Sequence, residues 1–498
     1  MLPLRSVELQ SDFKQQATGM KCLKRPYPFH SEEAGNSSSV SLHSDVTASS
    51  CRSIKYPYQD DAATMIYRPD FHVAKQEITE SRNQTTLDAR EIDTTVPDLS
   101  LRAQNKTTDD VRSEMASPSD GRWAANLLLE CADAISNKDV SRIQHLMWIL
   151  NELASPYGDY DQRLASCFLQ ALYLKITGAG PRCYRHLCAA AERNYSFELM
   201  RQMLLKFQEA SPWITFGHVA ANGAIMEAVD GDQNVHIVDI SNTLCTQWPT
   251  LLEALATRPD GAPHLRLTTI MATNTTPAVK VMNEISNRLK KFARLMGVPF
   301  ELTVLHQPEL EKLQLDMLDL REGEALAINC THTLHQVSQK GDGQFSPRDF
   351  ILCTLRNMNP KIVTVVEDEV DLGSSDFMNC FSEILRFYSL RFDSLEESFP
   401  RTSNERLMLE KIAARDMVSL LACDESDNVQ RQEKSDQWVL RLKRLGFAPA
   451  KFSDDVVDDV RALLKRYKEG WDYVNTESGL FLTWKEQRAI FASAWTAC

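Results

Sequence analysis

One aspartate in the sequence has the setting of a ligand-binding residue. Asp239 lies near the end of residues 235–240, a β-branched run typical of a buried strand. Ligands of open α/β sheets bind beyond the carboxyl ends of such strands, so the loop 241–246 is the first place to look for chemistry. A nucleotide-binding loop needs glycines, which let the backbone approach the cofactor, and this loop has none. We therefore expect no cofactor, and keep as the alternative a small-molecule-binding or methyltransferase-like cleft near Asp239.

Acidic residues gather after a second predicted strand, at 362–366. Glu367, Asp368 and Glu369 follow it directly, with Asp371 close behind. Clustered carboxylates at a strand end can hold a metal ion or act as an acid and base pair. Because no histidine or further acidic motif stands at a recognisable spacing, we interpret them as a solvated loop or as caps of the next helix.

The cysteines and histidines do not form a metal-binding or catalytic signature. Cys183, His186 and Cys188 offer three zinc ligands, whereas a closed structural site has four. His332 and His335 follow a predicted strand, where lone histidines are more often structural or exposed. The motifs of serine hydrolases, zinc proteases and phosphate-binding loops are absent from the sequence. The residues therefore predict a protein that is not an enzyme and holds no metal.

The elements that must position these residues alternate between strands and helices, which implies a mostly parallel sheet with helices on both faces. Two closing strands, 479–484 and 489–495, have the pattern of an antiparallel hairpin. This is the element order of methyltransferase-like, doubly wound α/β domains. We predict such a core sheet within 231–498, with helical insertions, and an α-helical cap over 120–230. The predicted parallel strands are 235–240, 264–272, 300–306, 325–330 and 362–366.

The bulk composition limits the kinds of partner. The 498 residues carry a net charge of −13, whereas a surface that binds duplex DNA unaided usually has a basic excess. We therefore expect contact with DNA to be indirect, through partners. Residues 1–119 are rich in polar residues without a sustained period, which predicts a disordered tail. Scattered cysteines, no signal sequence and no bilayer-spanning apolar run predict an intracellular protein that meets no membrane.

Large apolar side chains in the helical block favour binding over catalysis. Met147 and Trp148 add more apolar surface than one narrow helical stripe requires. A helix face that its own domain leaves uncovered needs a partner, although the α/β core could equally cover this one. Trp471, Trp484 and Trp495 are similarly ambiguous, and packing in the core is the favoured role for them.

Several motifs together resemble the GRAS family of plant regulators. Residues 235–239, Val-His-Ile-Val-Asp, resemble the VHIID signature, with leucine-rich helical regions on either side. Residues 400–410 are similar to the arginine- and glutamate-bearing part of the PFYRE region, and 493–495 match the SAW motif. The resemblance covers about residues 121–498. The motif and interaction candidates are Met147, Trp148, His236, Asp239, Gln247, Trp248, Pro249, Arg401, Glu405, Arg406, Trp484 and Trp495.

The resemblance implies a function as well as a fold. Members of the GRAS family have an α/β core related to methyltransferases, a helical cap, no established catalysis and no cofactor. They are nuclear co-regulators of plant development that pair with other GRAS proteins, SCARECROW-like ones among them, and dock onto zinc-finger transcription factors. For this chain the resemblance implies a protein-interaction scaffold in root or tissue patterning, located in the nucleus and also in the cytoplasm.

Overall fold

The structure is a computed structural model that describes residues 122–497, apart from 242, 273–274, 340–344, 375 and 424–431. The predicted disordered tail, 1–119, lies outside the described residues. Within them, no helix has both the length and the apolar character needed to cross a bilayer.

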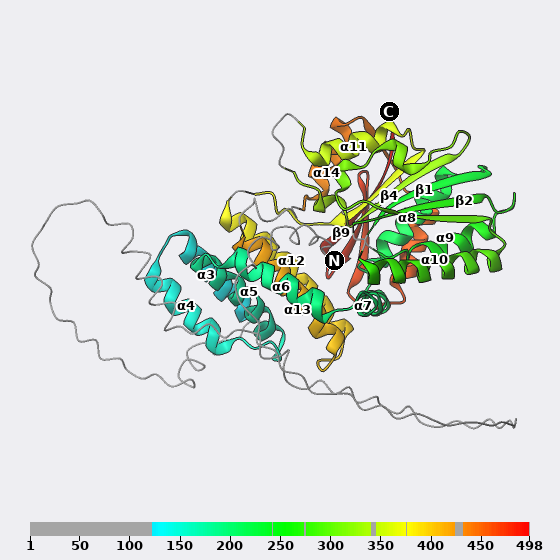
Figure 1. Cartoon of the computed structure of the whole chain (residues 1–498). Helices are drawn as coiled ribbons and strands as arrows, with labels where there is room; N and C mark the ends of the chain where they lie inside the picture. Colours follow the sequence, from blue (N-terminus) through cyan, green and yellow to red (C-terminus); the bar gives the residue numbers. More distant parts are fainter. Residues whose placement is uncertain are drawn as a thin grey trace, which may run out of the picture. The chain divides into compact units, whose positions relative to one another are not determined.

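Nine strands of the described chain form one sheet (Figure 1): β1 Asn234–Ser241, β2 His264–Met271, β3 Phe300–His306, β4 Ala325–Thr331, β5 Ile362–Asp368, β6 Phe447–Ala450, β7 Trp471–Thr476, β8 Gly479–Trp484 and β9 Gln487–Ala497. Their order is β3-β2-β1-β4-β5-β9-β8-β7, and β6 pairs with β9. Strands β1 to β5 are parallel to their neighbours among themselves, whereas β9, β8 and β7 are antiparallel to the strands beside them. From β1 the chain adds β2 and β3 on one side, and it then returns to add β4 and β5 on the other side of β1. The boundary between β1 and β4 is therefore the switch point of the strand order, where doubly wound sheets bind ligands.

Apolar side chains leave the sheet on both faces, as a doubly wound fold requires. Along β1, Val235 and Ile237 belong to one buried cluster, whereas Val238 and Ile240 belong to another. Helices that contribute to the first cluster include α8 Thr215–Ala228, α9 Trp248–Ala256, α10 Thr276–Met296 and α15 Asp454–Leu464. On the other face, shown at the top of Figure 1, lie α11 Pro347–Asn357 and α14 Ser435–Arg444.

Helices from two separate stretches of the chain form the helical cap (Figure 1): α3 Trp123–Ser136, α4 Val140–Leu153, α5 Tyr160–Thr177 and α6 Gly180–Asn194 from the first, α12 Phe377–Ser398 and α13 Asn404–Ala422 from the second. The second pair packs against α3, α5 and α6. α7 Phe197–Ala210 contacts both α13 and α10. α8 instead packs on β4, β5 and β9, and a β-carbon added at Gly217 would lie only 2.5 Å from Val366, so glycine permits the close approach.

The predicted fold class is confirmed: a mostly parallel, doubly wound sheet carries antiparallel strands at its C-terminal end. The predicted hairpin corresponds to β8 and β9. Two short strands, β6 and β7, were not predicted from the sequence. β6 has four residues, one of them Pro449, and β7 is largely polar, so neither has the apolar signal of a buried strand.

Helix ends follow local chemistry. Pro249 lies in the first turn of α9, where its missing N–H is not needed. The Thr250 hydroxyl donates to the Gln247 carbonyl oxygen at 2.9 Å instead of capping the helix. α10 ends at Gly297, whose φ of 74° is a left-handed conformation that glycine adopts without steric cost. α9 thus begins just after the loop 241–246, where the sequence placed the candidate ligand site.

Candidate functional site

The carboxyl end of β1 contains a fully buried carboxylate. Asp239 is 0% exposed and accepts hydrogen bonds from Trp248 Nε1 and from Asn329 Nδ2, each at 2.9 Å. Burial raises the pKa of Asp239, and these donors partly offset the rise. Both donors belong to the protein itself, one on α9 and one on β4. The side chain that the alternative hypothesis placed in a ligand-binding cleft is thus a buried hydrogen-bond acceptor between two elements.

Buried amides extend this network across the switch point. Asn329 Nδ2 also donates to Gln247 Oε1 at 3.1 Å, and Gln247 Nε2 donates to Asn222 Oδ1 at 3.0 Å. Asn222, on α8, donates in turn to Thr250 Oγ1 at 3.0 Å. Thr364 of β5 donates to Asn329 Oδ1 at 3.0 Å. Side chains from β1, β4, β5, α8 and α9 therefore satisfy one another at the place where a ligand of this fold would bind.

The loop between β1 and α9 turns without glycine. Leu244 and Cys245 have φ values of 52° and 59°, in the left-handed region that non-glycine residues seldom adopt. The turn brings Trp248 over Asp239, where its indole is 1% exposed. The Trp248 indole and the side chains of Leu244 and Cys245 thus occupy the positions where a cofactor-binding loop would have glycines. The arrangement does not provide a phosphate-binding turn.

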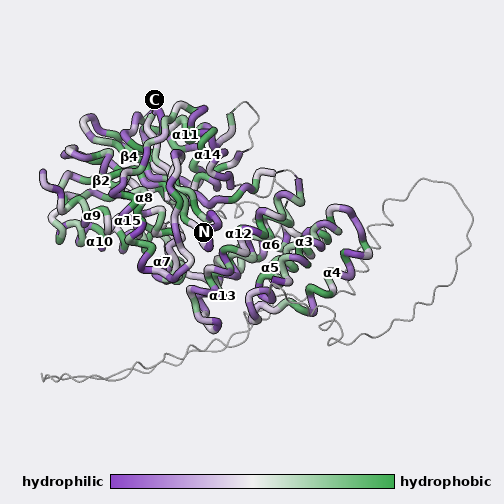
Figure 2. Tube along the Cα trace, turned by 180° about the vertical axis from the view of Figure 1, so that it is seen from behind, coloured by the Kyte–Doolittle hydropathy of each residue, from purple (hydrophilic) through white to green (hydrophobic). Residues whose placement is uncertain are grey.

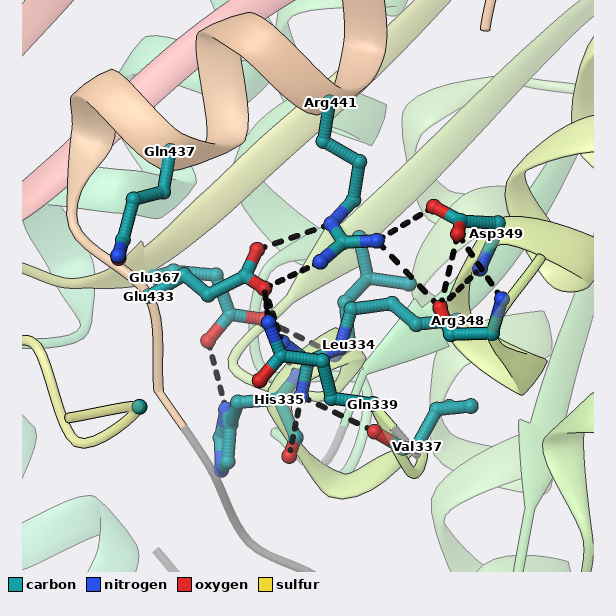
Figure 3. Close-up of polar contacts among 12 residues, drawn as sticks. Leu334, His335, Val337, Gln339, Arg348, Asp349, Glu367, Glu433, Gln437 and Arg441 are labelled. Carbon is teal, nitrogen blue, oxygen red and sulfur yellow. Dashed lines mark hydrogen bonds and ion pairs between the residues drawn. The ribbon is translucent and has the colours of Figure 1, made fainter. Parts of the chain in front are cut away.

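The end of β5 carries a buried acid–imidazole pair (Figure 3). Glu367 Oε2 lies 2.6 Å from His335 Nδ1, and Glu367 Oε1 accepts the Leu334 backbone N–H at 2.9 Å. Burial alone would raise the pKa of Glu367, but the interaction with His335, together with the Arg348 guanidinium, outweighs burial and lowers it. The pair fixes the short 3-10 helix Leu334–Gln336, which follows β4, against the end of β5.

The two following carboxylates hold other segments in place. Asp368 accepts from Trp213 Nε1 at 3.2 Å and from Gln432 Nε2 at 2.7 Å. Glu369 accepts both the backbone N–H and the hydroxyl of Ser435, each at 2.9 Å, at the start of α14. The solvated-loop interpretation of this acidic run is therefore wrong, because all three carboxylates are buried. The alternative, that they cap the next helix, is also wrong, because Asp376 caps α12 and Glu369 instead meets the start of the distant α14.

A second ionic cluster joins α11 to α14 in Figure 3. Arg348 is fully buried and lies 3.1 Å from Glu433, and it also donates to the backbone carbonyl oxygens of His335 and Val337. Arg441 of α14 bridges Glu433 and Asp349. Burial lowers the pKa of Arg348, against the attraction of Glu433. Every charge in this cluster has a partner of opposite sign, as a buried structural network requires.

Two buried histidines lie near the carboxyl ends of β1, β4 and β5, which together are called the carboxyl edge. His332, with a φ of 52°, makes no hydrogen bond through either ring nitrogen within the described chain, and its Nδ1 lies 3.7 Å from Asp368. His218 of α8 is also buried, and burial lowers its pKa to about 3. No group of three or more His, Cys, Asp or Glu side chains in the described residues is arranged to hold a metal ion. Burial lowers the pKa of His332 as well, so both imidazoles are neutral parts of the core at neutral pH.

The predicted residues of the cap and C-terminus divide between buried and exposed positions. Met147 is 2% exposed and Trp148, the next residue, is 40% exposed on the outer side of α4. Trp484 and Trp495 are buried, and their indole nitrogens donate to Asp393 and Ser493 respectively. Of these four side chains, only Trp148 presents a large apolar surface to a partner.

Of the arginines in the 400–410 segment, Arg406 is buried in the cap, whereas Arg401 is exposed. Arg406 donates to Glu396 of α12 at 2.8 Å, and the same carboxylate pairs with Arg163 of α5. Arg163 Nε also pairs with Glu410 at 3.1 Å, so three cap helices meet at one ionic cluster. At its edge, Arg401 pairs with Glu396 at 3.2 Å, and Glu405 accepts from the capping Ser403 hydroxyl at 2.8 Å.

His236, the histidine of the 235–239 motif, is also internal. It lies on β1 with Nε2 2.9 Å from Thr268 Oγ1 and is 1% exposed. Burial lowers its pKa to about 4, so the imidazole is neutral at pH 7. Sequence reasoning missed Asn329, Trp213 and Glu433 as members of the networks. Asn329 alone had a signal, since it is a polar residue in an otherwise apolar strand.

Comparisons with known proteins agree with the resemblance seen in the motifs. The model of the GRAS domain family matches residues 124–496. Protein SHORT-ROOT of Arabidopsis thaliana is 53% identical over 392 residues, covering 75% of this chain and 73% of that protein. Protein SHORT-ROOT 1 of Oryza sativa subsp. japonica is 50% identical over 414 residues, covering 75% and 68%. The crystal structure of SCL7 in Oryza sativa, 26% identical, has a TM-score of 0.64 and covers 75% of this chain and 99% of that one.

Proposed function

Because the chain belongs to the GRAS domain family, we propose that it is a nuclear scaffold that regulates transcription by binding other proteins. Its similarity to SHORT-ROOT proteins makes it a plant GRAS regulator of development. The proposed partners are other GRAS proteins of the SCARECROW-like kind and zinc-finger transcription factors. Sequence-specific contact with DNA would come from those partners, and tissue patterning is the developmental setting that we infer.

The exposed indole of Trp148 is the observation that carries the scaffold role. On α4 it is surrounded in helical register by the exposed Ser141, His145 and Glu152, so it projects from a polar face. Tryptophan is enriched among the residues that dominate binding energy at protein interfaces. The neighbouring Met147 and Leu146 are already buried, so the cap does not need this side chain for its own core. A partner that covers Trp148 would remove its apolar surface from water.

The filled carboxyl edge supports the non-enzymatic part of the proposal. Asp239, the residue that a ligand of this fold would approach, is 0% exposed and already accepts two internal hydrogen bonds. Opening that site would leave Trp248 Nε1 and the Asp239 carboxylate without partners in a buried place, which is costly. The cleft alternative therefore requires a rearrangement that binding of proteins at the cap does not.

The test is binding of a purified SCARECROW-like GRAS protein to the full chain and to Trp148→Ala. A tryptophan side chain buries roughly 150–250 Å² at most, so a 40% exposed one offers about 100 Å² to a partner. At about 25 cal/mol per Å² this is ~2.5 kcal/mol, or roughly 60-fold in Kd. We expect a loss of that order by isothermal titration calorimetry.

A charge-matched pair of variants controls for general effects of substitution. Trp148→Arg should abolish binding, whereas Leu295→Arg, at a 79% exposed position on α10, should leave it intact. Circular dichroism spectra of both should match that of the unaltered chain. Unchanged affinity for Trp148→Arg would refute α4 as the docking surface. Zinc-finger transcription factors are titrated in parallel to learn whether they share it.

A further inference from the structure

Helix α10 is strongly basic in an acidic protein. It contains five basic residues and one acidic residue, whereas the whole chain carries a net charge of −13. The apolar side of α10 is anchored in the core through Val281, Met282 and Leu289, among others. The alternation of polar and apolar residues along the helix can be followed in Figure 2. Its outer face is therefore a rigidly held surface whose charge opposes that of the molecule.

Four of the basic residues share one narrow arc of the helix. With 3.6 residues per turn, Lys280, Lys290, Lys291 and Arg294 lie within an arc about 100° wide. All four are exposed, and no salt bridge to any of them occurs in the part of the chain that the structure describes. The fifth, Arg288, lies outside the arc and pairs with Glu284 at 3.9 Å. The arc thus presents four unneutralised positive charges.

The remaining residues of the arc are polar and neutral. Asn283 and Asn287 fall between the cations, both exposed, and Thr276 lies at the start of the helix. The arc contains neither a carboxylate nor an apolar side chain. From Lys280 to Arg294 it extends about 21 Å, at a rise of 1.5 Å per residue. A partner that fits must therefore be elongated, polar and regularly negative.

We propose that this arc of α10 binds the phosphate backbone of duplex DNA. B-DNA carries a negative charge about every 1.7 Å along its axis, and proteins contact it through Lys, Arg and Asn side chains. A protein partner would require apolar anchors at the centre of its interface, and the arc has none. Leu295, the exposed apolar residue closest to the arc in sequence, projects outside it. The geometry therefore favours DNA over an acidic peptide.

The contact adds to the proposed function without depending on it. Phosphate contacts orient a protein on the duplex but carry no sequence information, so specificity would still come from a zinc-finger partner. Four cations alone give weak binding. Once a partner tethers the chain to DNA, however, the second contact becomes intramolecular, and even a weak one lengthens the residence of the complex.

Fluorescence anisotropy of the full chain alone with a labelled duplex of about 20 base pairs tests the proposal. Neutralising four phosphates predicts a slope of about −3.6 for log affinity against log salt. A rise from about 50 to about 200 mM salt should then weaken binding roughly 150-fold. Because no partner is present, the outcome is independent of whether the cap binds GRAS proteins.

A quadruple variant, K280Q/K290Q/K291Q/R294Q, should bind the duplex at least tenfold more weakly and lose nearly all of the salt slope. The matched control K138Q/K443Q/K465Q/K468Q removes the same charge from exposed lysines outside α10 and should behave like the unaltered chain. Equal affinities and slopes for the two variants would overturn the proposal. So would binding of a polyglutamate peptide of the same charge with no binding of the duplex.

Discussion

Replacing Asp239 separates a structural role of the carboxyl edge from a ligand-binding role. In Asp239→Ala, Trp248 Nε1 loses its 2.9 Å acceptor, whereas Asn329 Nδ2 keeps the bond to Gln247 at 3.1 Å. A hydrogen bond to a charged group contributes about 1.5–3 kcal/mol, so losing two costs roughly 3–6 kcal/mol. Removing a buried carboxyl, whose pKa burial has raised, offsets part of this. We expect the free energy of unfolding to fall by about 3 kcal/mol.

The assay is equilibrium urea unfolding followed by far-UV circular dichroism, which does not depend on the fluorescence of Trp248. Asp239→Asn keeps the shape but offers one acceptor in place of two, so its loss should be about half as large. Asp459→Ala, on the exposed side of α15, is the matched control and should unfold close to the unaltered chain.

A ligand-binding carboxylate would behave in the opposite way. Residues held for a ligand are often poorly satisfied without it, so their removal costs little stability or even adds some. A loss below about 1 kcal/mol for Asp239→Ala would refute the structural reasoning. Binding of S-adenosylmethionine that disappears in this variant would point to the cleft alternative instead.

Two further perturbations probe the edge. Glu433→Ala leaves the fully buried Arg348 without its counter-charge and should cost about 3–5 kcal/mol in urea unfolding, whereas Glu477→Ala, at an exposed pair with Lys451, should cost little. Because the pKa of Glu367 is lowered in the folded state, its contribution is present above the unfolded value of about 4.5 and is lost as pH falls through the folded pKa. Thermal unfolding should therefore show Glu367→Gln less stable than the unaltered chain at pH 7, with the difference narrowing below about pH 4.5; a difference that does not change with pH would contradict this origin.

The fold could be predicted because its signals are local. Residues 235–240 and 362–366 are runs of strand length rich in β-branched residues, and the helices between the strands have an apolar period, so alternation alone gives a doubly wound sheet. Gly297 marks a helix end because it has no β-carbon and adopts a left-handed φ without steric cost, and Pro249 marks a helix start because its ring fixes φ and removes the N–H. These features depend on neighbours within a few residues.

The polar networks could not be predicted because their partners are remote in sequence. Glu369 meets Ser435, and Arg163 meets Glu396, only after the chain has folded. From sequence, an acidic run such as 367–369 is indistinguishable from a solvated loop, since burial depends on which segments return to cover it. The cap shows the same limit: Met147 and Trp148 are adjacent, and only the packing of α4 decides which one is buried.

The carboxyl edge and the cap are also physically continuous, which affects how mutations in the motifs of residues 235–239 and 400–410 are interpreted. Asp368 holds Trp213, whose ring lies 5.7 Å from that of Phe387 on α12 and 6.1 Å from that of Trp471. α12 in turn packs on α3 of the cap. A substitution at the buried edge can therefore displace cap helices without touching any partner. Loss of partner binding in a variant such as Asp239→Ala would consequently not identify a contact residue, whereas loss in a stably folded Trp148→Arg would, because that side chain is outside both networks.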